Sequence, residues 1–136
     1  MSRTILYPSD ELIRTVTATL LGANEQWDST PLFLGLTLAG PDQIGVLTQP
    51  TSTDPPFQDL ATAVFSRAPR HTLWGFGFHA TAAMMRTADA RGNLWTASRD
   101  HPGSDVVETF RSAENGVPDD PIDRELWAAA VALAAL

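Results

Sequence analysis

The segment Thr72–Thr87 constrains the fold more than any other part of the chain, because it is apolar at both sets of alternating positions. In a strand, successive side chains point to opposite faces of the sheet. One set contains Trp74, Phe76, Phe78, Ala80, Ala82 and Met84, and the other contains Gly75, Gly77, His79, Thr81, Ala83 and Met85. We therefore predict one long central strand with helices covering both of its faces.

Three segments carry the pattern of a helix that begins at a capping residue. Asp10–Leu21 has apolar residues at helical spacing and follows Ser9, whose hydroxyl can accept a hydrogen bond from the first turn. Asp54 and Asp120 each precede a proline, which is well tolerated at the first helical position. We predict helices that begin at these three caps, the second of them ending before Pro69.

Two turn sequences predict hairpins. Leu32–Leu38 and Ile44–Thr48 are apolar segments separated by Gly-Pro-Asp-Gln, which is typical of a tight turn. Leu94–Arg99 follows the central strand after a turn in which Gly92 can take a positive φ. Val106–Arg111 is then the last predicted strand.

The predicted elements follow the order α-β-β-α-β-β-β-α. This order predicts a single α+β domain over residues 1–136, with an antiparallel sheet of about five strands. Three helices would flank the sheet, one on one face and two on the other. The element order is similar to that of profilin-like and roadblock-like domains, and its outline is similar to that of small acidic secretion chaperones. This resemblance of outline implies no site residues.

Composition restricts the class of partner. The net charge is −7, and the nine basic residues, all of them Arg, are scattered along the chain. Nucleic-acid binding draws most of its affinity from cations on phosphates, and anionic membranes also attract cations, so we expect neither as a partner. The use of Arg without Lys, together with abundant Ala, Thr, Asp and Pro, indicates a G+C-rich genome.

The sequence also predicts a cytoplasmic location. Residues 1–8 lack the long apolar stretch of a signal peptide, and no segment approaches the ~20 apolar residues of a membrane-spanning helix. The chain has no cysteine, which excludes disulfides, thiolate zinc sites and a cysteine nucleophile.

His79 is the residue on which an enzymatic interpretation depends. In one interpretation, the missing side chains of Gly75 and Gly77 leave a groove in which His79 binds a ligand or acts as an acid–base group. In the interpretation that we favour, His79 is a structural residue beneath a helix. Its ring would then make a hydrogen bond to a backbone or hydroxyl group and stay neutral.

The remaining motifs do not predict catalysis. Asp100 and His101 are adjacent, but neighbouring strand residues point to opposite faces, and His71 is expected at the surface. The three histidines show none of the spacings typical of metal sites, and no serine lies in a nucleophile elbow. Gly75-Phe76-Gly77 fits no phosphate-binding loop. We therefore expect no catalytic residue, no metal and no cofactor.

The four tryptophans are the remaining functional signal. Trp27 lies in a polar connection and Trp95 on a predicted hairpin strand, so both are candidates for contact with a partner. Trp74 and Trp127 are expected in the core instead.

These observations favour a small non-enzymatic protein-interaction or regulatory module, which we expect to be a homodimer. One alternative is a small-molecule-binding or enzymatic domain with a cleft near Gly75–His79. Another is an acidic chaperone or inhibitor that occupies a basic surface of its partner.

Overall fold

The computed structural model describes residues 5–23, 31–40, 42–50, 57–67, 72–81, 83–101 and 103–135. Its longer elements are α1 (Asp10–Ala23), β1 (Leu32–Gly40), β2 (Gln43–Pro50), α2 (Gln58–Phe65), β3 (Leu73–Thr81), β4 (Met84–Asp89), β5 (Leu94–Ser98), β6 (Val107–Arg111) and α3 (Pro121–Val131). Two short 3₁₀ helices, η2 (Ala113–Asn115) and η3 (Ala132–Ala135), flank α3.

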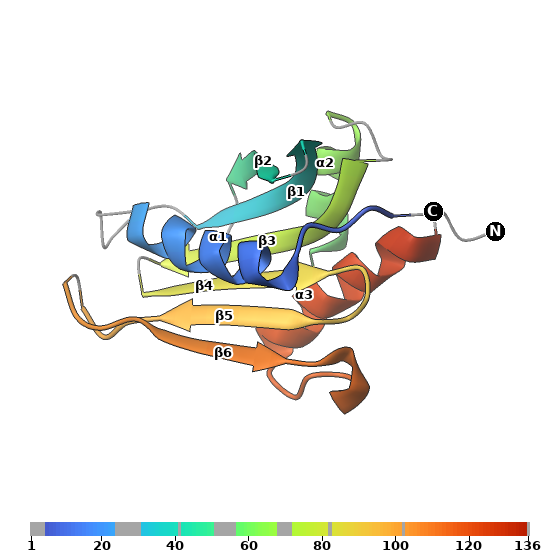
Figure 1. Ribbon diagram of the computed structural model, residues 1–136. Coiled ribbons are helices and arrows are strands. Elements are labelled where there is room, and N and C mark those ends of the chain that lie inside the picture. Colours follow the sequence, from blue (N-terminus) through green and yellow to red (C-terminus); the bar gives the residue numbers. More distant parts are fainter. Residues whose placement is uncertain are drawn as a thin grey trace.

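The described strands form one antiparallel sheet in the order β2-β1-β3-β4-β5-β6. Helix α1 packs on β4 and β5 on one face, whereas α2 packs on β1 and β2 and α3 on β3 and β4 on the other (Figure 1). The predicted α+β class and the division of one helix against two are therefore confirmed. None of the described helices is long and apolar enough to cross a membrane.

The prediction of a single strand over Thr72–Thr87 is wrong. The chain turns between Thr81 and Met84, so β3 and β4 form a hairpin in which Phe78 lies opposite Arg86. The described part of the sheet consequently has six strands rather than about five. The turn contains no Gly, Pro, Asn or Asp, and a buried hairpin is apolar on both faces just as a long buried strand is.

A bulge in β3 corrects the predicted faces as well. Leu36 of β1 lies opposite Gly75 while Thr37 lies opposite Leu73, which leaves Trp74 as an extra residue. An extra residue breaks the alternation of side chains. Trp74 therefore does not share a face with Phe76 and Phe78, as its position in the sequence predicts.

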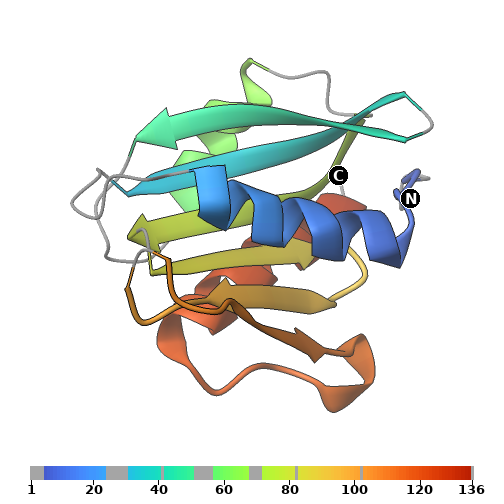
Figure 2. The ribbon, with the colours of Figure 1, turned by 60° about the vertical axis from the view of Figure 1, so that its left-hand side comes forward.

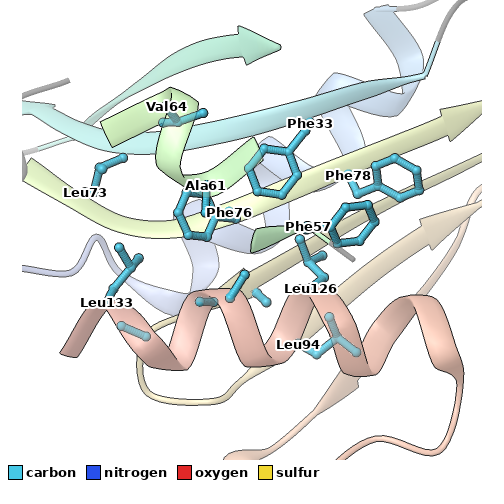
Figure 3. Packing of buried hydrophobic residues seen from close by; sticks show 14 residues of the cluster. Phe33, Phe57, Ala61, Val64, Leu73, Phe76, Phe78, Leu94, Leu126 and Leu133 are labelled. Atoms are coloured by element: carbon cyan, nitrogen blue, oxygen red, sulfur yellow. The ribbon is translucent and has the colours of Figure 1, made fainter. Parts of the chain in front are cut away.

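Two hydrophobic cores result, one on each face of the sheet. The first core lies beneath α2 and α3, where the rings of Phe33, Phe57, Phe76 and Phe78 pack against one another and against Leu126 and Leu133 (Figure 3). The second core lies beneath α1 and joins Ile13 and Leu21 of the helix to Trp74, Met85 and Trp95 of the sheet.

The caps of α1 and α3 are those predicted. Leu12 N–H donates to Ser9 Oγ at 3.1 Å, and the N–H groups of Ile122 and Asp123 donate to Asp120 Oδ1 at 2.9 and 3.0 Å. Helix α2 begins at Gln58, and its N-cap residue Phe57 makes no side-chain cap. The predicted cap at Asp54 lies outside the described residues.

Replacing Gly75 by Ala tests the close packing at the bulge. A Cβ at this position would overlap the backbone oxygen of Ala88, so Gly75→Ala is expected to lower the free energy of unfolding by about 1–3 kcal/mol. A Cβ at Gly22, in the last turn of α1, would meet no atom within 4 Å. Gly22→Ala is therefore the matched control, and urea titration should show it to be neutral or up to about 1 kcal/mol stabilising. Equal effects of the two substitutions would contradict this account of the packing between Gly75 and Ala88.

Replacing Asp120 by Ala tests the cap of α3. The variant leaves two backbone N–H groups without their acceptor, and we expect a loss of about 0.5–2 kcal/mol in the free energy of unfolding. Asp119→Ala removes the same charge from the exposed neighbouring residue and should change stability by less than about 0.5 kcal/mol. Thermal or urea unfolding of both variants distinguishes a cap from a general charge effect.

Candidate functional site

The space left by the glycines of β3 is filled by protein atoms. Gly75, Gly77 and His79 are all buried. A Cβ built on Gly77 would lie 2.7 Å from Met85 Cε and 3.3 Å from Leu34 Cδ1, so these two side chains occupy the predicted groove. The ligand-binding role of the three residues stays a prediction, and this packing does not favour it.

His79 is buried beside a positive charge. His79 is only 6% exposed, and its Nε2 atom has no hydrogen-bond partner in the described part of the chain. Burial lowers the pKa of His79 below its ordinary value, and the nearby Arg99 guanidinium lowers it further. The lowered pKa favours the predicted neutral form, which stays a prediction, and the hydrogen bond predicted for the ring is not found at Nε2 in the described part of the chain.

The other candidate residues are exposed or lie outside the described part of the chain. His101 and Asp100 are exposed at the turn after β5, where Ser104 N–H donates to the His101 carbonyl at 3.0 Å. Trp27 and His71 lie outside the described residues. Among the residues that the structure describes, no three His, Asp or Glu side chains lie close enough together to hold a metal ion.

The described tryptophans are covered by their own chain. Trp74 is fully buried, as predicted, and Trp127 is partly buried and donates its indole N–H to the Gly92 carbonyl at 3.0 Å. Trp95 is only 4% exposed, and its ring lies 5.2 Å from the ring of Phe110 between centroids. The partner contact of Trp95 stays a prediction, and Phe110 is the exposed member of this pair.

Strand β6 is the most exposed part of the sheet. Phe110 is 55% exposed on the α1 face, where it lies opposite Trp95. Val107 is 60% exposed and lies opposite Ser98. Because Ala97, the neighbour of Ser98, is buried under α1, Val107 points to the other face. Strand β6 forms one edge of the sheet (Figure 2), and its apolar side chains, exposed on both faces, are the first feature of the candidate site.

A hollow of about 240 Å³ beside this edge is the second feature. It lies between α1 and β6, and it is lined by the aromatic pair and by polar residues that include Asp10, Glu11, Arg14 and Glu108. Arg14 donates to Glu11 and, at 3.2 Å, to both carboxylate oxygens of Glu108. The guanidinium of Arg14 lowers the pKa of Glu11.

A buried carboxylate holds the beginning of α1 in place. Asp89 is fully buried and accepts hydrogen bonds from the N–H groups of Arg91 and Asn93 at 3.0 and 3.1 Å. Arg91 also pairs with Asp10 at 3.0 Å and lies 4.3 Å from the centre of the Tyr7 ring. These contacts tie the wall of the hollow to the turn between β4 and β5.

A second hollow, of about 340 Å³, lies on the opposite face of the same strands. Its charged residues already have partners within the protein. Arg86 donates to Asp123 at 2.6 Å, and Arg111 donates to the carbonyls of Asn115 and Val117 at 2.9 and 3.3 Å. The Arg86–Asp123 pair is mostly buried and joins β4 to α3, which is a structural role.

Comparison with known proteins adds no site residues. The chain matches no family model, no curated protein and no solved structure. The candidate site therefore depends on the geometry of the β6 edge and the adjacent hollow.

The pH dependence of stability tests the burial of His79. Because the pKa of His79 is lower in the folded state, the unfolded chain takes up a proton first as the pH falls below the ordinary value of 6.5. The free energy of unfolding should therefore decrease as the pH falls through this window, and be unaffected by His79 at higher pH. His79→Gln removes this contribution, so urea titrations should show a shallower decrease for the variant. The same decrease in both proteins would contradict this effect.

Proposed function

We propose that this protein is a non-enzymatic protein-interaction module that acts as a homodimer, with β6 of one protomer pairing with β6 of the other. The observation that carries the proposal is the exposure of Val107 and Phe110 on opposite faces of one edge strand. The proposal places the protein in the cytoplasm, in keeping with its cysteine-free sequence.

Exposure on both faces favours an added strand over a partner that packs on one face. An edge strand offers unpaired backbone groups to another strand, and side chains on both faces then gain cross-strand neighbours. A helix laid across the sheet would cover only Val107 or only Phe110. Val106, which is 40% exposed and precedes β6, extends the same apolar edge.

The sequence of β6 is compatible with pairing to a second copy of itself. If two antiparallel β6 strands are centred on Thr109, Glu108 lies opposite Phe110 and Val107 lies opposite Arg111. No like charges then face each other, and the central pair is Thr against Thr, which is favourable across strands. Centring on Glu108 would instead place two carboxylates together.

A charge introduced on the edge tests this interface. Val107→Arg would face Arg111 across the proposed dimer, so light scattering should give the mass of one 14.7 kDa chain for the variant and of two chains for the wild type. Leu6→Arg, at a 70% exposed position outside the sheet, and Val46→Arg, on the opposite edge strand, are the matched controls and should remain dimeric. Circular dichroism confirms that each variant is folded.

Salt provides a second test of the same interface. Each protomer carries a net charge of −7, and screening reduces the repulsion between two such chains. The dimer should therefore persist to a lower protein concentration in about 0.3 M salt than in about 0.05 M salt. A wild type that stays monomeric across a micromolar dilution series, or a dimer broken by Val46→Arg instead, would refute the proposed interface.

A further inference from the structure

The hollow between α1 and β6 has a chemistry that the dimer does not explain. We infer that it receives an arginine side chain from an extended basic segment of a partner protein. This inference goes beyond the proposed function, because residues of α1, β5 and β6 of one protomer line the hollow without a contribution from a second chain.

The size of the hollow restricts its occupant. Its volume of about 240 Å³ is smaller than the roughly 300–1,000 Å³ that is typical of pockets for small-molecule ligands. One long side chain suits this space better than a nucleotide or a drug-sized molecule. A side chain carried on an extended segment can enter while the backbone of the segment stays outside.

The aromatic wall suits a guanidinium group. Phe110 presents a half-exposed ring supported by the buried ring of Trp95, with the two centroids 5.2 Å apart. Arginine stacks on such faces through its planar, weakly hydrated cation, and it does so better than the strongly hydrated ammonium of lysine.

The carboxylates of the hollow supply the complementary charge. Asp10, Glu11 and Glu108 line it together with Arg14, and Asp10 also pairs with Arg91. Arg14 already places its guanidinium against Glu11 and Glu108, which shows that these carboxylates are arranged to accept this group. The Arg14 side chain is 46% exposed, so an incoming arginine can share or displace it. The net charge of −7 attracts a basic segment from a distance.

Fluorescence anisotropy with a labelled hexa-arginine peptide tests the site. Glu108→Gln should weaken binding about threefold or more, as expected for the loss of a partly exposed ion pair. Glu114→Gln makes the same change of charge on η2, outside the hollow, and should bind nearly as the wild type does. A hexa-lysine peptide should bind the wild type more weakly than hexa-arginine.

In a second pair of variants, we expect the affinity for hexa-arginine to change in the opposite direction. Arg14→Gln removes the resident cation and should tighten binding of hexa-arginine, whereas Arg124→Gln, an equal change of charge on α3, should have a smaller effect. Equal effects within each pair would show attraction to the acidic protein as a whole and would overturn the inference. So would the absence of binding to the wild type.

The outcome is separable from that of the proposed dimer. Added salt should weaken peptide binding but strengthen the dimer, and light scattering on each variant reports the mass independently. A monomeric protein that binds hexa-arginine through Glu108 would refute the dimer and keep this inference, whereas a dimer without such binding would do the reverse.

Discussion

The burial of β3 on both faces is the constraint on which the rest of the structure depends. Its phenylalanines face α2 and α3, while Trp74 is turned by the bulge toward α1. Gly75, which follows the bulge, has no room for a side chain, because the backbone of Ala88 in β4 lies where a Cβ would be. Met85 fills the space beside Gly77 in the same way. The space beside these glycines is therefore filled by protein atoms, and the hollows that the described residues form lie toward the β6 edge.

The exposure of β6 follows from the width of the sheet. Strands lie about 4.8 Å apart and a helix is about 10 Å wide, so one helix covers roughly two strands. Helix α1 covers β4 and β5, and α3 covers β3 and β4 on the other face. Strand β6 lies beyond both helices (Figure 1).

Features decided by nearby residues were predictable from the sequence. The caps at Ser9 and Asp120 depend on two or three neighbouring backbone groups, and the positive φ of Gly92 depends on its own turn. The break in Thr72–Thr87 and the position of Trp74 were not predictable, because they depend on pairing with β1 and β4.

The candidate site shows the same division. Trp95 was recognised as a residue of interest, yet whether it or Phe110 is exposed depends on which strands α1 covers. The contact between Arg14 and Glu108 joins the α1 side of the hollow to the β6 side, and these two residues lie far apart in the sequence. No local pattern predicts that pair. The buried role of the Asp89 carboxylate is likewise not predictable, because in the sequence Asp89 forms part of an ordinary turn.

The two edge strands of the sheet differ in a way that affects how many chains can associate. Strand β2 terminates at Pro50, which cannot donate a ladder hydrogen bond, whereas the described residues of β6 include no proline. In the proposed dimer β6 pairs with β6 through the same edge of both protomers, so the assembly would close at two chains. The outer edges of the joined sheet would then be the two β2 strands. If self-association uses the β6 edge alone, it therefore forms one closed contact and not an open-ended array.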